Sequence, residues 1–195
     1  MPPRCFIALT LPEGVVRTLV SARRLFLADA PGWTGEKWVA APALHVTLAF
    51  LGDLDDGAVE AAAPRMIEAA SRISSFDLRL TGVVPVPSHH SVGMLWATLG
   101  DPDDRLAALR DALMTAFPQV GLDAHRPLRP HVTLVRTRSP RRVVPGPLAA
   151  ASSLVEAAGK ERGGVVSVRS ATLFSSTLRS TGPEYREIVV AHLGR

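Results

Sequence analysis

The chain has 195 residues, of which 47% are hydrophobic and 21% are charged, and its formal net charge is +4 at pH 7. This size and composition indicate a folded globular protein, and no run approaches the roughly 18 apolar residues of a membrane helix. The N-terminal residues lack the apolar run of a secretory signal peptide, so we expect a cytoplasmic protein without a membrane partner.

The first part of the chain predicts strands at residues 4–11, 37–40 and 44–51, with helices at residues 12–28 and from about residue 57 to residue 73. The single cysteine, Cys5, excludes a disulfide framework and is interpreted as a small buried hydrophobe. Asp53, Asp55 and Asp56 lack the spacing of a calcium loop. We interpret them as turn residues, with Asp55 or Asp56 capping the second helix.

The second part predicts strands at residues 76–84 and 93–99 separated by a loop at 85–91, then a helix at 103–117 and a strand at 131–136. A basic linker at 140–147 precedes a helix at 148–160. Strands at 165–175 and 184–193 follow, with a turn at 180–183 between them.

This alternation predicts an α+β fold with approximate internal duplication. We expect a single domain over residues 1–195 that consists of two pseudo-symmetric lobes. Each lobe is a small antiparallel sheet with helices on its outer face, and the active-site cleft lies between the lobes. No sequence feature indicates an interface between copies, so we expect a monomer.

A repeated tetrapeptide is the most specific feature, because residues 45–48 and 131–134 are both His-Val-Thr-Leu. Side chains alternate between the two faces of a strand. His45 and Thr47 therefore share one face, and His131 and Thr133 share the corresponding face of the second copy. In the first copy, the apolar face is expected to carry Leu44, Val46, Leu48 and Phe50 toward the core.

Two imidazoles and two hydroxyls without an accompanying carboxylate or cysteine favour proton transfer over metal binding. One neutral imidazole can take a proton from a nucleophile while the other, protonated, gives one to the leaving group. Threonine hydroxyls can hold phosphate oxygens. The pattern predicts phosphodiester hydrolysis, with a metal site or a structural coincidence as the competing interpretations.

Arginines surround the second copy of the motif. Of the 22 Lys and Arg residues, only Lys37 and Lys160 are lysines, which either suits phosphate binding or reflects an arginine-rich genome. Between residues 124 and 155 there is no Asp or Glu. The arginines of this stretch are Arg126, Arg129, Arg136, Arg138, Arg141 and Arg142. They predict an anion-attracting segment beside a histidine.

The chain resembles the RNA 2',3'-cyclic phosphodiesterases, also called 2'-5' RNA ligases, of the two-histidine (2H) phosphoesterase superfamily. The resemblance covers nearly the whole sequence. It is carried by residues 4–8, 38–39, 44–52, 95–96, 129–136, 173–176 and 182–185, of which the two histidine motifs are the specific part.

The resemblance implies an enzyme without metal or cofactor that opens the terminal 2',3'-cyclic phosphate of RNA to a 2'-phosphate, with reversible 2'-5' ligation as a side activity. Fragments of tRNA are one candidate substrate. By motif match, His45 is the proton donor and His131 the proton acceptor. Thr47, Thr133 and Arg129 bind the phosphate. Because the cleft is nearly symmetric, the sequence does not itself fix which histidine is the acid.

Two alternatives differ in substrate or in class. The same mechanism could act on small cyclic nucleotides or on 2'-5' oligonucleotides, and a comparison of mononucleotide and oligonucleotide turnover separates these. A non-catalytic module that binds RNA ends would use the arginine-rich segment as its footprint and would not depend on the two histidines.

Overall fold

The computed structural model describes residues 3–118, 128–179 and 182–194. The helices are α1 (Glu13–Asp29), α2 (Asp56–Ser71), α3 (Arg105–Met114) and α4 (Pro145–Gly159). The strands are β1 (Arg4–Thr10), β2 (Lys37–Trp38), β3 (His45–Asp53), β4 (Phe76–Ser88), β5 (Ser91–Gly100), β6 (His131–Arg141), β7 (Val165–Val168), β8 (Ser170–Arg179) and β9 (Gly182–His192). None of the helices in these ranges has the length and hydropathy that crossing a membrane requires.

Within the described residues, the strands form one antiparallel sheet in the order β7-β4-β5-β6-β3-β1-β8-β9, and β2 adds to β6. The two predicted sheets correspond to β7-β4-β5-β6 and β3-β1-β8-β9. They are joined by a single register pair, Val46 opposite Val132, between the two motif strands. The predicted α+β class with two related halves is therefore confirmed, and the sheets of the halves are continuous.

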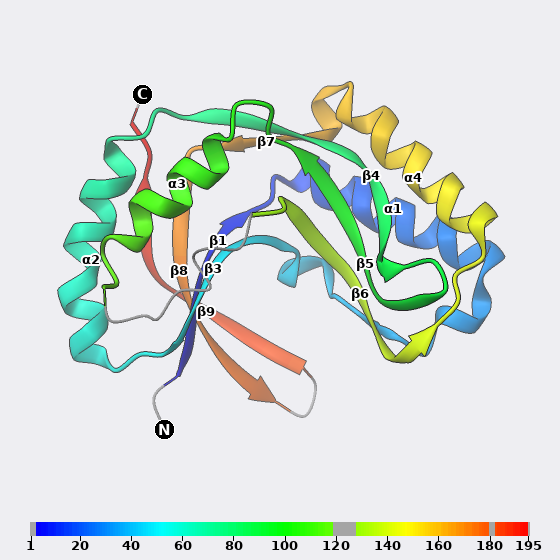
Figure 1. The fold of residues 1–195 in the computed structure, drawn as a ribbon, viewed down its shortest axis with the longest axis horizontal. Helices are drawn as coiled ribbons and strands as arrows, with labels where there is room; N and C mark the ends of the chain where they lie inside the picture. The colour runs from blue at the N-terminus through cyan, green and yellow to red at the C-terminus, as the bar shows by residue number, and fades with distance from the viewer. Residues whose placement is uncertain (1–2, 119–127, 180–181, 195) are drawn as a thin grey trace.

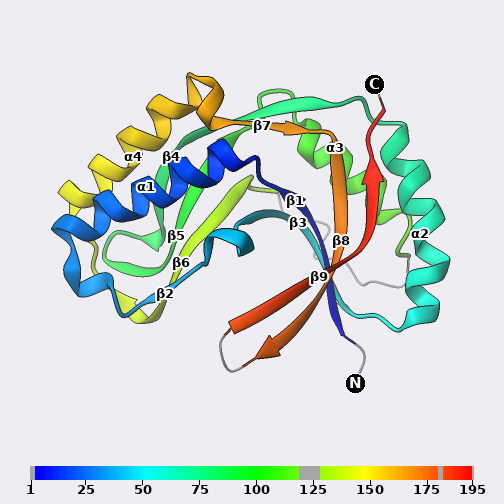
Figure 2. The same cartoon turned by 180° about the vertical axis from the view of Figure 1, so that it is seen from behind.

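The two halves have equivalent strands, since β3 corresponds to β6, β1 to β5, β8 to β4 and β9 to β7. The helices cross between halves. α1 follows β1 but packs against α4, which covers β4, whereas α3 follows β5 but packs against α2, which contacts β9. Figures 1 and 2 show these two helix pairs outside opposite ends of the curved sheet. Each half thus supplies a helix to the other, which ties the lobes together.

The helices form where the sequence pattern predicts them. α1 buries one stripe at helical spacing, made of Val15, Leu19, Ala22 and Phe26. α2 begins with a cap in which the Asp55 carboxylate accepts a hydrogen bond of 2.7 Å from the backbone N–H of Ala58. The capping prediction is therefore confirmed.

The predicted loop at residues 85–91 is wrong, because β4 continues through Pro85 and Pro87 to Ser88 and forms a hairpin with β5. Proline has no N–H to donate, so a strand tolerates it only where no neighbour needs that donor. β7 pairs only with the stretch of β4 from Phe76 to Arg79. Among the described residues, no strand pairs with the outer edge of β4 at either proline.

The predicted strand at residues 165–175 is two strands, which separate at Arg169. β7 pairs with β4 in one half of the sheet, and β8 pairs with β1 in the other half. The apolar alternation of the sequence shifts by one residue at this point, from Val166 and Val168 to Ala171 and Leu173, where the pairing partner changes. The chain thus passes from one lobe to the other without a loop, and the shift in alternation is the sequence signal of this crossing.

Packing of α4 on β4 depends on Gly159. A Cβ atom there would overlap the carbonyl oxygen of Leu80, whereas a Cβ at Gly146 of the same helix would meet nothing within 4 Å. We expect Gly159→Ala to lower the free energy of unfolding by about 1–3 kcal/mol or more. Gly146→Ala should change it by less than about 1 kcal/mol. Urea unfolding of both variants checks this, and equal effects would contradict the packing described.

Candidate active site

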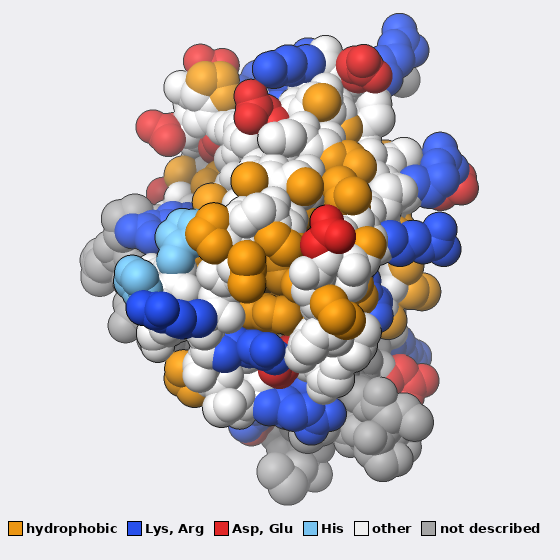
Figure 3. All heavy atoms as spheres, turned by 90° about the vertical axis from the view of Figure 1, so that its right-hand side faces the viewer, with side chains coloured by type: hydrophobic (Ala, Val, Ile, Leu, Met, Phe, Trp, Pro, Cys, Tyr) orange, Lys and Arg blue, Asp and Glu red, His pale blue; other side chains and the backbone are white. Residues whose placement is uncertain are grey.

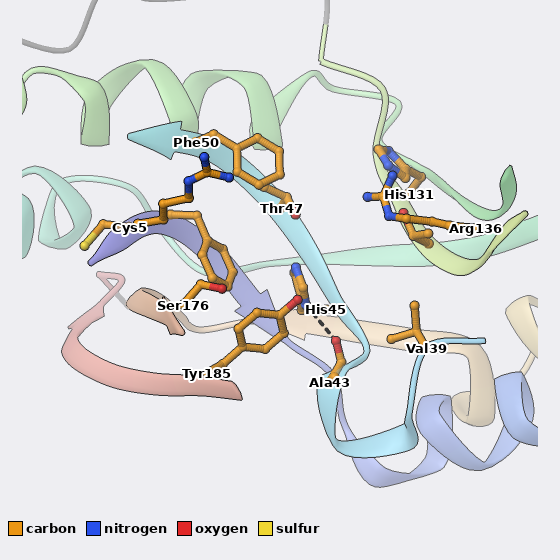
Figure 4. A pocket seen from close by; sticks show the side chains of 13 residues that line it. Cys5, Val39, Ala43, His45, Thr47, Phe50, His131, Arg136, Ser176 and Tyr185 are labelled. Atoms are coloured by element: carbon orange, nitrogen blue, oxygen red, sulfur yellow. Dashed lines mark hydrogen bonds between the residues drawn. The ribbon is translucent and has the colours of Figure 1, made fainter. Parts of the chain in front are cut away.

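A pocket of about 270 Å³ lies between the two motif strands, on the sheet face opposite the buried core (Figure 4). It brings together His45, Thr47, His131 and Thr133, four of the residues that the sequence singled out. The other residues that line it are Arg4, Cys5, Phe6, Val39, Ala43, Phe50, Arg136, Ser176 and Tyr185. The strands β1, β3, β6, β8 and β9 all contribute to this wall.

The strand alternation that the sequence predicted places these side chains. Val46 and Val132, the residues between each histidine and its threonine, are completely buried in the core. Both histidines and both threonines are half-buried on the pocket side. The apolar residues thus hold the strands against the helices while the polar residues face the cavity.

Both imidazoles are held in the same way. Nδ1 of His45 lies 2.7 Å from the carbonyl oxygen of Ala43, and Nδ1 of His131 lies 2.7 Å from the carbonyl oxygen of Arg129. A carbonyl oxygen only accepts a hydrogen bond, so Nδ1 carries the proton in each ring. Nε2 is then the nitrogen that can exchange a proton with a bound molecule. The two rings therefore present equivalent atoms for acid and base chemistry.

Burial lowers the pKa of both imidazoles. For His45 the Ala43 carbonyl opposes this effect, and the positive charges of Arg136 and His131 add to it. For His131 the Arg129 carbonyl opposes the effect of burial, and Arg136 again adds to it. The neutral form of each ring therefore predominates down to a lower pH than in an ordinary histidine.

Each motif strand contains a bulge after its threonine. Leu48 has no partner in the β1–β3 register, and Leu134 has none in the β5–β6 register. An extra residue reverses the alternation beyond it. Phe50 is consequently 73% exposed and lines the pocket, so the prediction that it faces the core is wrong. Arg136 occupies the equivalent position in β6 and also lines the pocket (Figure 4).

The arginines of the predicted anion-attracting segment do not all face the pocket. Arg136 points into the pocket, whereas Arg138 donates from Nε to the carbonyl of Gly35 and Arg141 pairs with Glu36 at 2.7 Å. The exposed side chain of Arg129 is not among the pocket-lining residues. Arg126 lies outside the described residues. Figure 3 shows basic side chains flanking an apolar area on the side that carries α4.

The structure adds aromatic residues that the motifs did not predict as neighbours of the histidines. The Phe6 ring centroid lies 5.2 Å from that of His45, and Tyr185 meets the same imidazole at 89° with centroids 5.4 Å apart. Burial raises the pKa of the Tyr185 phenol, so it keeps its proton and can donate a hydrogen bond. The sequence signal was only the aromatic residue at each position, since β1 and β9 are far from both motifs in the chain.

Two further predictions concern Cys5 and metals. Cys5 is 2% exposed, and burial raises the pKa of its thiol, as expected of a small buried hydrophobe. Among the residues that the structure describes, no group of three or more His, Cys, Asp or Glu side chains is placed to hold a metal ion.

Comparison with known proteins supports one family. A family model described as the 2'-5' RNA ligase superfamily matches residues 20–173. The RNA 2',3'-cyclic phosphodiesterase of Methanothermobacter thermautotrophicus is 26% identical over 196 residues, which cover 99% of this chain and 100% of that protein. The protein of the same name from Bacillus subtilis is 29% identical over 135 residues, covering 69% of this chain and 71% of that one.

Solved structures share the fold over the whole chain. The protein TT0787 of Thermus thermophilus superposes with a TM-score of 0.75 at 24% identity, covering 98% of this chain and 99% of that one. Escherichia coli LigT in its apo form gives a TM-score of 0.72 at 24% identity, covering 100% and 99%. The family match extends over most of the sequence and includes both histidine motifs. This chain belongs to the 2'-5' RNA ligase superfamily, as its resemblance to the two-histidine phosphoesterases implied.

Proposed function

We propose that this protein hydrolyses the 2',3'-cyclic phosphate at the end of an RNA to a 2'-phosphate, without a metal ion, and that His45 and His131 are its acid and base. The observation that carries the proposal is the pair of imidazoles that face one pocket from equivalent strands, each with Nδ1 protonated and Nε2 available. The names of the curated relatives support the substrate and the reaction.

The chemical step needs an acid and a base on opposite sides of the phosphorus. His131 Nε2 takes a proton from water as the water oxygen bonds to phosphorus. The bond from phosphorus to the 3' oxygen breaks, and His45 gives its Nε2 proton to that oxygen. The product has a 3'-hydroxyl and a 2'-phosphate. Figure 4 shows the two rings on different sides of the pocket, as this in-line displacement requires.

The phosphate would be held by three side chains. Thr47 and Thr133 donate hydroxyl hydrogen bonds to the non-bridging oxygens, and the Arg136 guanidinium balances their negative charge. This assignment replaces Arg129 by Arg136 as the main cation, because Arg136 lines the pocket and Arg129 does not. The Arg129 carbonyl instead orients His131.

Ligation follows from the same geometry in reverse. A 5'-hydroxyl in place of water would attack the cyclic phosphate and leave a 2'-5' bond, with the two histidines in unchanged roles. This reaction competes with water, so it is favoured only when the two RNA ends are held together.

The first prediction concerns the two histidines. In excess chelator, the wild type should convert an oligoribonucleotide with a 2',3'-cyclic phosphate end to the 2'-phosphate. His45→Ala and His131→Ala should each lower kcat by about 10²–10⁴-fold, because each removes one proton transfer. His192→Ala, outside the pocket, is the control. Product isomers are read by chromatography.

Other outcomes of that assay identify the alternatives. Activity lost to chelator in the wild type would mean that the histidines are metal ligands. Equal turnover of a cyclic mononucleotide would move the substrate to small cyclic nucleotides. Tight RNA-end binding with no turnover, unaffected by either substitution, would indicate a binding module.

The second prediction concerns pH. His131 must be neutral and His45 protonated in the free enzyme, so kcat/KM should follow a bell in pH. Because burial and Arg136 lower the pKa of both rings, the centre of the bell should lie below the ordinary imidazole pKa of about 6.5. A bell centred well above pH 7 would contradict these environments.

The third prediction compares two arginines. Arg136→Met should lower kcat/KM by about 10–100-fold through loss of a charged hydrogen bond to phosphate. It should also move both limbs of the pH profile to higher pH. The substitution removes a positive charge that disfavours protonation, so the pKa of both imidazoles rises. Arg129→Met should have the smaller effect in both measurements. A larger loss in Arg129→Met would restore the sequence-based assignment.

A further inference from the structure

The two imidazoles have different aromatic surroundings although their hydrogen bonds match. The His131 ring is stacked on Trp96, with ring centroids 3.8 Å apart and planes 20° apart. The rings near His45 are more distant and inclined to it, with Phe6 at 37° and Tyr185 at 89°. In the described part of the chain, a parallel aromatic face therefore supports His131 and has no counterpart at His45.

This difference occurs at equivalent positions of the two halves. Trp96 is the β5 partner of Thr133, and Ala8 is the β1 partner of Thr47. The same site in the sheet therefore carries an indole beside the second motif and a methyl group beside the first. The pseudo-symmetry of the cleft is broken here by a large change in side chain.

Burial of the Trp96 indole carries a free-energy penalty that an apolar side chain would not have. Trp96 Nε1 is buried and has no hydrogen-bond partner among the described residues. A buried N–H without an acceptor opposes folding, and a phenyl ring, although smaller, would give the imidazole an aromatic face without that group. What an indole adds over a phenyl ring is a stronger attraction between its face and a cation.

We propose that Trp96 is the positioning residue that makes His131 the base, because its face fixes the plane of the imidazole and stabilises the imidazolium that forms when His131 takes a proton from water. The inference rests on the proposed function. His45 must lose a proton in the same step, and its inclined aromatic neighbours give no stacked face to the charged form. The contact with Trp96 thus fixes the direction of proton transfer in a nearly symmetric cleft.

Of the other charged or titratable groups around the pocket, Arg136 acts on both rings, and Tyr185 contacts His45 edge-on without stacking on it. Arg136 on β6 disfavours protonation of both rings. Arg4 on β1 and Tyr185 on β9 line the same cavity that both rings face. The carbonyl contacts of the two Nδ1 atoms have equal length, 2.7 Å. The stacked indole is the contact that distinguishes His131.

The decisive experiment is an NMR titration of the histidine ring resonances in the full chain without substrate, for the wild type, Trp96→Phe and Trp96→Leu. His45→Gln assigns the two active-site signals. Trp96→Leu should lower the pKa of His131 by about 0.5 to 1, and Trp96→Phe by less, while His45 changes little. An unchanged His131 pKa in the folded Trp96→Leu protein would overturn the proposal.

Activity and stability measurements separate positioning from packing. Trp96→Leu should lower kcat about tenfold, keep KM within about twofold and move the acidic limb of the kcat/KM profile to lower pH. Trp96→Phe should recover part of kcat, because a phenyl ring also presents an aromatic face to the imidazole. A Trp96→Phe protein that loses stability but keeps the His131 pKa would show a packing role alone and overturn the proposal.

Trp38→Phe is the matched control, because the Trp38 indole donates from Nε1 to the Trp33 carbonyl at 2.8 Å and is not among the ring contacts of either imidazole. This control should lose stability and leave both histidine pKa values unchanged. The titration needs no substrate, so its result is independent of the reaction. If the wild type hydrolyses no cyclic phosphate, the proposed function is wrong. If the pKa of His131 is the same in the wild type and the Trp96 variants, only this inference is wrong.

Discussion

The contact on which the site depends is the backbone pairing of Val46 with Val132. It joins the two halves of the sheet at equivalent residues, so a pseudo-twofold axis passes between them. Because the strands are antiparallel, the order from His45 to Thr47 opposes the order from His131 to Thr133. Imidazoles and hydroxyls therefore alternate around the pocket. A bound phosphate would have one imidazole and one hydroxyl on each side without any loop to position them.

The bulges after the two threonines turn this symmetric frame into a specific pocket. A regular strand would have left Phe50 and Arg136 on the core face, where a guanidinium would be desolvated at high cost. The skipped residues Leu48 and Leu134 instead turn both side chains to the cavity. Equivalent backbone irregularities thus deliver an apolar aromatic ring on one side and a cation on the other. The backbones of β3 and β6 are thus equivalent around the pocket, and the two walls of the pocket differ in chemistry through their side chains.

The sequence was sufficient for features that depend on local pattern. The repeated motif predicted which faces of β3 and β6 carry the histidines, and the loop before α2 predicted a cap at Asp55 or Asp56, of which Asp55 forms it. The sequence did not predict the face of a side chain where a bulge in the strand pairing changes the inside–outside alternation. The bulge at Leu48 reversed the predicted face of Phe50. The equivalent bulge at Leu134 turns Arg136 into the pocket, whereas the motif pattern had indicated Arg129. A bulge is set by the register with the neighbouring strand, which a single sequence does not contain.

The lowered pKa of both histidines connects the fold to the binding of an anion in the pocket. The apolar face that holds β3 and β6 in the sheet also brings both imidazoles out of water, and Arg136 adds a positive charge that disfavours their protonation. A phosphate anion in the pocket would counter Arg136 and stabilise an imidazolium beside it. Binding of the anion would thus raise the proton affinity of the site when an acid is needed. The same burial that builds the core therefore favours neutral imidazoles in the empty pocket, and an anion bound beside them would favour a protonated one.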